Sequence, residues 1–244
     1  MQHSNSHTIK FILLLTIVVS FLLSITSTQL AYLQKKNVDI DRKKNLLKSI
    51  GIDVSDFDSE KILREYNIRI SDVIIHLNGE IATNIKFEDL DLIENKATGG
   101  INYFKNEKEY LPLYSSSNPL AIIVPISGKG LWSTLYGYIA LEPDFNTIKG
   151  ITFYKHKETP GLGGEVDKHW FQNNFIGKKF VDPENNLVGI KVLKGKVDPN
   201  NKTAYHQVDG ISGATITSKG LENFLLNDLK KYDLFFQKIR DRQG

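Results

Sequence analysis

The chain has 244 residues, a formal net charge of +3 and no cysteine. Apolar residues make up 41% and charged residues 24%, as is ordinary for a globular protein. Because no basic stripe with interleaved aromatic residues accompanies this near-balanced charge, nucleic-acid binding is disfavoured. The lack of cysteine excludes a disulfide framework and fits an exported domain, although a cytosolic one can also lack cysteine.

A long apolar segment lies near the N-terminus. Residues 9–25 are apolar apart from Lys10 and a few hydroxyl residues, and a weaker apolar stretch follows them. Together they give about 20 residues, enough to cross the core of a bilayer. A cleaved signal peptide is the alternative, but no clean Ala-x-Ala site follows Leu23 and the run is long for such a peptide. We therefore expect a tail over residues 1–8 and an uncleaved transmembrane anchor over residues 9–32.

A charged region follows the anchor, and we interpret residues 33–117 as a juxtamembrane and accessory lobe of mixed α and β structure. The patterns predict helices over residues 38–50 and 59–66 and a strand over residues 72–77. Three serines, an asparagine and a proline at residues 115–119 are typical of a linker or a turn. We therefore place a domain boundary between residues 117 and 118.

The remainder of the chain, residues 118–244, is denser in residues that favour strands. The predicted elements are strands over residues 120–126, 136–141, 148–154 and 187–193, and helices over residues 165–173 and 218–240. The predicted fold class is α+β, an antiparallel-sheet domain with an accessory lobe behind one N-terminal transmembrane helix.

Two glycine-rich loops interrupt this second region. Gly-Lys-Gly-Leu-Trp at residues 128–132 joins two predicted strands, where a hairpin turn is the plain interpretation. Glu-Thr-Pro-Gly-Leu-Gly-Gly at residues 158–164 is longer, and its proline and glycines favour a rigid turn whose backbone amides can approach a flat or anionic group. Neither loop has the spacing of a Walker phosphate loop.

The most informative stretch is Asp-Gly-Ile-Ser-Gly-Ala-Thr at residues 209–215, directly before the last predicted helix. It sets the hydroxyl of Thr215 behind a run of very small residues. We expect Thr217 or Ser218 to cap the helix, which places Thr215 where unpaired helix N–H groups favour an anion. A loop that merely caps a helix is the simpler interpretation, and helix-start statistics alone favour it.

Residues 209–218, taken together, also resemble a known motif. Asp-Gly-x-Ser-Gly-Ala-Thr-x-Thr-Ser resembles the flavinylation motif of the covalent-FMN-binding family, that of the C subunit of the Na(+)-translocating NADH:quinone reductase. The Gly-Leu-Trp turn and the Glu-Thr-Pro-Gly-Leu-Gly loop resemble segments of the same family. The resemblance is good over residues 120–232, holds by position for the anchor and is poor over residues 50–115.

This resemblance implies one covalent FMN. A flavin transferase would join the FMN phosphate to the Thr215 hydroxyl as a phosphoester. The implied residues around the phosphate are Ser212, Gly213 and Ala214, and those around the flavin ring are Glu158, Thr159, Gly161, Leu162 and Gly163. The dimethylbenzene edge of the flavin needs an apolar slot, and Leu131, Trp132 or Leu162 could supply part of it.

The resemblance also implies a role. The chain would be an electron-transfer subunit of a complex that couples NADH oxidation and quinone reduction to sodium export, beside other membrane subunits. Since no Gly-x-Gly-x-x-Gly follows a strand, the subunit alone is not expected to oxidise NADH. No metal site is expected, because His156, Glu158, Asp167 and His169 lack metalloprotease spacing.

The orientation in the membrane gives two conflicting expectations. Six lysine and arginine residues lie within about 20 residues after the span, against Lys10 before it, so the positive-inside rule alone indicates a cytoplasmic domain. The resemblance implies the outer, periplasmic face of the cytoplasmic membrane. We favour the outer face, because large domains cross membranes largely regardless of charge.

Two other functions remain open. The flavin subunit of the ion-translocating ferredoxin:NAD oxidoreductase complex shares the anchor, the flavin domain and the motif. The lobe before residue 117 and the region Asp-Arg-Lys-Lys-Asn at residues 41–45 favour the quinone reductase. The other possibility is of a different class, a membrane-anchored binding or assembly protein whose Thr215 loop is only a helix cap.

Overall fold

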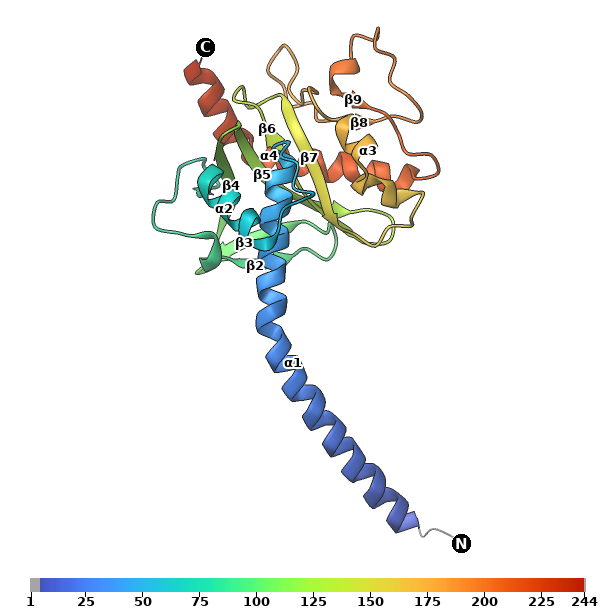
Figure 1. Cartoon of the computed structure of the whole chain (residues 1–244). Coiled ribbons are helices and arrows are strands. Elements are labelled where there is room, and N and C mark those ends of the chain that lie inside the picture. Colours follow the sequence, from blue (N-terminus) through green and yellow to red (C-terminus); the bar gives the residue numbers. More distant parts are fainter. Residues whose placement is uncertain (1–4, 244) are drawn as a thin grey trace. The chain divides into compact units, whose positions relative to one another are not determined.

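The computed structural model describes residues 5–243, and it contains two compact units (Figure 1). The first ends at Arg42 and the second begins at Lys43. The first helix, α1 (Asn5–Ser49), is 45 residues long. The helix predicted over residues 38–50 is thus the last part of this longer helix.

The first part of α1 is apolar on every side. Its large apolar side chains from Ile9 to Leu33 are exposed, and the helix is long and apolar enough to cross a membrane. The hydroxyl of Thr16 donates to the carbonyl of Ile12 at 2.8 Å, which satisfies this polar group within the helix. Such internal pairing is what a helix needs in hydrocarbon, so this part of α1 fits a transmembrane anchor.

The second unit is built on an antiparallel sheet of seven strands. The order is β2-β3-β4-β5-β6-β7, and β1 pairs with β4. The strands are β1 (Ile70–His76), β2 (Asp91–Glu94), β3 (Ile101–Lys105), β4 (Lys108–Ser117), β5 (Leu120–Lys129), β6 (Thr134–Leu141) and β7 (Ile148–Lys155). This confirms the predicted antiparallel sheet and the α+β class.

The accessory region and the region after residue 118 share this sheet. β4 and β5 form a hairpin in which Ser117 pairs with Leu120, and the turn between them contains the cis Asn118–Pro119 bond. The predicted boundary between residues 117 and 118 therefore falls inside a hairpin of a continuous sheet. Of residues 115–119, where a linker or a turn is expected, the first three belong to β4 and the last two form the turn.

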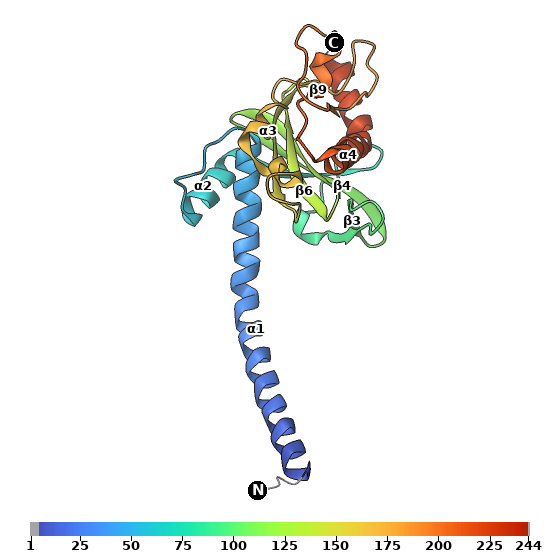
Figure 2. The same cartoon turned by 90° about the vertical axis from the view of Figure 1, so that its right-hand side faces the viewer.

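The last helix, α4 (Thr215–Gln243), covers one face of the sheet. Apolar residues that recur at helical spacing form a buried face of α4, which packs on β5. The contact is close, because a Cβ on Gly128 of β5 would lie 2.1 Å from Cβ of Phe224. Figure 2 shows α4 beside the sheet. This face forms the main core of the unit, including Leu221, Phe224, Leu225, Leu229, Tyr232 and Phe236.

Short elements fill the remaining segments. They are α2 (Ser59–Arg69), the 3₁₀ helices η1 (Phe87–Asp89), η2 (Gly163–Asp167) and η3 (Ala204–His206), α3 (His169–Asn173), and the parallel pair β8 (Lys191–Val192) and β9 (Gln207–Val208). The helix expected over residues 165–173 is divided, because Lys168 has an extended backbone between η2 and α3. The strand expected over residues 187–193 is reduced to β8, since Gly189 before it has φ +71°.

Candidate functional site

The motif loop, residues 209–214, leads from β9 into α4 and depends on its two glycines. A Cβ on Gly210 would lie 1.7 Å from the carbonyl oxygen of Leu193, and the amide of Gly210 donates to the carbonyl of Gly195 at 2.8 Å. Gly213 has φ +71°, and a Cβ there would lie 2.7 Å from Cδ2 of Leu162. Only glycine allows this close approach and this backbone conformation. The motif is thus folded tightly against two other loops.

Thr215 is the first residue of α4. The amide of Ser218 donates to the carbonyl of Ala214 at 2.9 Å, so Ala214 rather than Thr217 or Ser218 occupies the N-cap position. The predicted caps are therefore wrong, and the helix begins three residues earlier than predicted. Thr215 is exposed. Its hydroxyl lies on the first turn, where helix N–H groups lack intrahelical acceptors and favour negative charge.

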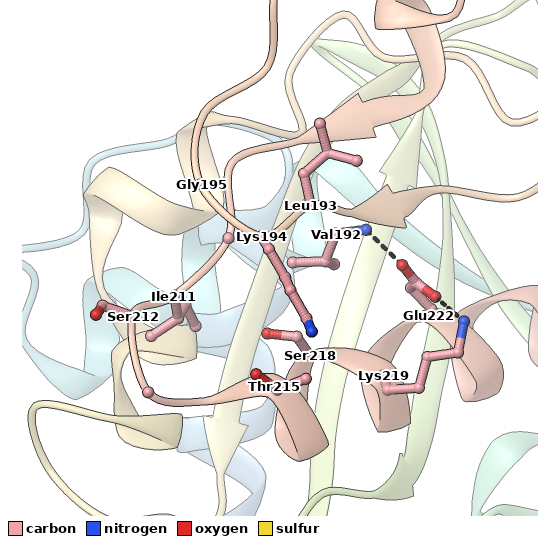
Figure 3. Close-up of a pocket in the computed structure, with 12 residues that line it drawn as sticks. Val192, Leu193, Lys194, Gly195, Ile211, Ser212, Thr215, Ser218, Lys219 and Glu222 are labelled. Atoms are coloured by element: carbon pink, nitrogen blue, oxygen red, sulfur yellow. Dashed lines mark hydrogen bonds and ion pairs between the residues drawn. The ribbon is translucent and has the colours of Figure 1, made fainter.

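A cavity of about 490 Å³ opens beside this first turn (Figure 3). The segment after β8 lines one side of it, and the motif loop and the start of α4 line the other. In Figure 3 the side chain of Lys194 extends toward the hydroxyls of Thr215 and Ser218. Lys219 stands at the rim, paired with Glu222, which also accepts the amide of Val192 at 2.8 Å.

The hydroxyl of Ser218, in the wall of this cavity, needs a hydrogen-bond acceptor. The residue is 7% exposed, and its Oγ is buried without a hydrogen-bond partner among residues 5–243. An unpaired buried hydroxyl costs free energy unless a ligand accepts its hydrogen bond. A phosphate oxygen would accept it, beside the ammonium of Lys194 and the N-terminus of α4. The donors present therefore suit a phosphate group.

Glu158 connects the glycine-rich loops to α4. Its carboxylate accepts the amides of Leu131, Trp132 and Ser133 at 3.2, 2.9 and 3.0 Å. It also accepts the hydroxyl of Thr217 at 2.7 Å. Burial raises the pKa of Glu158, but these hydrogen bonds to the charged form outweigh burial and hold the pKa below its usual value. The side chain is buried and ionised.

Comparison with known proteins identifies the family of this chain. Residues 130–230 match the family model of the FMN-binding domain. The chain is 31% identical to the C subunit of the Na(+)-translocating NADH-quinone reductase of Pseudomonas aeruginosa, over 98% of this chain and 97% of the relative. The chain belongs to this C-subunit family. The corresponding protein of Vibrio anguillarum is 33% identical over 98% of both chains.

Solved structures of the C-subunit family share the fold. The crystal structure of the family member from Parabacteroides distasonis is 33% identical, with a TM-score of 0.68 over 85% of this chain and 96% of that chain. NqrC of Shewanella oneidensis, at 24% identity, has a TM-score of 0.64 over 85% of this chain and 99% of that chain. The antiparallel-sheet domain inferred from the sequence is therefore that of the C-subunit family.

The structure brings the predicted loop at residues 158–163 to the motif of this C-subunit family member. Leu162, 42% exposed, lies over Gly213, and a Cβ on Gly163 would lie 2.6 Å from the hydroxyl oxygen of Thr217. The other predicted residues of this loop and the motif, Thr159, Gly161 and Ser212, are exposed, whereas Ala214 is buried. Trp132 is 71% exposed, and its amide, rather than its ring, is held by Glu158.

Sequence reasoning did not assign two of the polar side chains in the cavity, Lys194 and Ser218, to the site. Lys194 lies on a separate loop, which the pairing of β8 with β9 and the hydrogen bond between Gly210 and Gly195 bring to the motif. Ser218 lies in the motif but was assigned to helix capping. Of the four residues considered as metal ligands, His156 and Asp167 are paired at 3.4 Å, and within residues 5–243 no group of three or more His, Asp and Glu side chains is placed to hold a metal ion.

Proposed function

We propose that this chain carries FMN as a phosphoester on Thr215 and transfers electrons within a Na(+)-translocating NADH:quinone reductase. The observation that carries the proposal is the exposed Thr215 hydroxyl beside the buried hydroxyl of Ser218, which has no hydrogen-bond partner among residues 5–243. One group is open to modification, and the other requires an acceptor that a phosphate supplies. The family and the FMN-binding domain match support the same cofactor.

Different residues would hold the phosphate and the ring of FMN. The N-terminus of α4, Ser218 and Lys194 would neutralise the phosphoester, while Ser212 to Ala214 leave its approach open. The loop at residues 158–163 offers backbone groups for the polar edge of the ring, and Leu162 and Trp132 offer apolar contact. When bound, the flavin accepts and releases electrons, and the groups around it set its potential.

Attachment requires a flavin transferase. The Thr215 O–H bond is replaced by an O–P bond, and the proton leaves. An activated phosphoanhydride donor supplies the FMN phosphoryl group, and its leaving group takes the electron pair. A covalent bond prevents loss of FMN on the outer face of the membrane, where we place the domain. The apolar part of α1 would be the single-pass anchor beside the other membrane subunits, and sodium export would belong to the whole complex.

The test is coexpression of the full chain with a flavin transferase, followed by fluorescence of the denatured protein in a gel and mass spectrometry of the Thr215 peptide. Wild type and Thr215→Ser should carry flavin that survives denaturation, because both keep a hydroxyl. Thr215→Val should carry none. A wild-type chain without flavin, beside a control substrate that the transferase does modify, would refute the proposal and return Thr215 to a helix start in a binding or assembly protein.

A further inference from the structure

The carboxylate of Glu158 lies where three separate segments of the chain meet. It belongs to the loop after β7, accepts three amides of the turn between β5 and β6, and accepts the Thr217 hydroxyl from α4. The residue is 5% exposed. Hydrogen bonds to a charged acceptor are about twice as strong as neutral ones, so this group is a strong junction.

Two glycines make room for this junction. A Cβ on Gly130 would lie 2.7 Å from Oε1 of Glu158, and a Cβ on Gly163 would lie 2.7 Å from Oε2. The carboxylate is therefore enclosed between the turn on one side and its own loop on the other. Any side chain at either glycine would displace it, so the glycines of both loops serve the position of Glu158 as well as their own turns.

The helix is pressed against the same turn. A Cβ on Gly220, one and a half turns into α4, would lie 2.1 Å from the carbonyl oxygen of Lys129. The turn and the helix are thus in direct backbone contact, with the Glu158–Thr217 hydrogen bond beside it. The turn therefore meets the first turns of the helix that bears Thr215 at two points, directly at Gly220 and through Glu158 at Thr217.

We propose that Glu158 is a positioning residue: by joining the turn at residues 131–133 to Thr217, its carboxylate holds the flavin-ring loop at a fixed place relative to Thr215. This inference rests on the proposed function. It assigns the side chain of Glu158 to the protein rather than to the flavin, because its oxygens are already occupied by protein donors. The flavin would meet the backbone of this loop and not the carboxylate.

Hydrogen exchange on the flavin-free full chain in detergent tests the coupling. In Thr217→Val the amides of residues 131–133 should exchange at least tenfold faster than in wild type, because the carboxylate loses its support from α4. Thr217→Ser keeps the hydroxyl and should stay within twofold of wild type. Unchanged protection at the buried Ile139 shows that the sheet is intact. Wild-type exchange in Thr217→Val overturns the inference.

A second measurement uses the flavin-loaded chain. At one fixed solution potential, Thr217→Val should change the ratio of oxidised to reduced flavin at least threefold, and Thr217→Ser should not. A role limited to folding would leave this ratio unchanged in both variants, and that result overturns the inference. Absence of flavin in the wild-type chain refutes the proposed function instead, so the two failures are distinguishable.

Discussion

Helix propensity and the structure predict opposite effects of Gly220→Ala on the free energy of unfolding. In an isolated helix, alanine would stabilise by about 1 kcal/mol over glycine. Here the new Cβ would lie 2.1 Å from the carbonyl oxygen of Lys129. Carbon–oxygen contacts are normally about 3.3 Å or more, so α4 and the end of β5 must separate by about 1 Å.

The expected net effect follows from these two terms. Overpacking costs about 1–3 kcal/mol, and we take the upper end because the obstacle is backbone rather than a mobile side chain. After the gain of about 1 kcal/mol from propensity, Gly220→Ala should lower the free energy of unfolding by about 2 kcal/mol. The same strain should disturb the turn that contacts Glu158.

Urea unfolding of the full chain in detergent, followed by tryptophan fluorescence, measures this effect. The chain has two tryptophans, Trp132 and Trp170, and both lie in the unit after Lys43, so the signal reports that unit. Lys230→Ala, at an exposed position of the same helix, is the matched control and should change the free energy by less than about 0.5 kcal/mol. A Gly220→Ala chain as stable as wild type, or more stable, would refute the close contact between α4 and β5.

Three further predictions concern the cavity, the membrane and pH. Ser218→Ala should slow flavin loading of Thr215 about tenfold, because a hydrogen bond to a charged group contributes about 1.5–3 kcal/mol. The flavin-free Ser218→Ala chain should be at least as stable as the flavin-free wild type. Equal loading rates in the two chains would contradict the phosphate site. The orientation in the membrane can be tested by labelling, because the chain has no native cysteine. With the domain on the outer face, Lys202→Cys should react with a membrane-impermeant maleimide in intact spheroplasts, and Ser6→Cys should react only after permeabilisation. The reverse pattern would favour the cytoplasmic orientation that the charges indicate. Burial and Lys191 lower the pKa of His206, so as pH falls the unfolded chain binds a proton at this residue before the folded chain does. The free energy of unfolding should therefore fall as pH drops below about 6.5. Urea unfolding at pH 7 and pH 5 should show a weaker fall in His206→Gln than in wild type, and an identical fall would exclude His206 as a cause.

The sequence predicted the parts of this molecule that depend on local pattern. The apolar run after Ile9 predicted the anchor helix, and runs of residues that favour strands predicted β5, β6 and β7 close to their observed bounds. The domain boundary predicted after Ser117 falls inside the hairpin of β4 and β5, because a proline and serines mark a tight hairpin as well as a linker. Whether β4 continues the same sheet depends on strand pairing, which composition does not report.

The site shows the same division. Thr215 was singled out as the candidate residue because its motif is contiguous. The predicted start of its helix was wrong, because capping rules favoured the hydroxyls of Thr217 and Ser218. In the fold those hydroxyls serve other purposes, one bound to Glu158 and one left without a protein partner among residues 5–243. Lys194 could not be predicted, since contact between two loops leaves no periodic trace in the sequence.

The shared β4 strand limits how far the flavin-binding region can be treated as a transplantable module. β4 pairs with β1, β3 and β5, and Tyr232 of α4 donates to the carbonyl of Pro112 within it at 2.7 Å. A segment cut at residue 118 would expose the edge of β5 and leave a buried tyrosine hydroxyl without its acceptor. Grafting flavin attachment onto another protein therefore requires the sheet from β1 onward, and not the motif-bearing half alone.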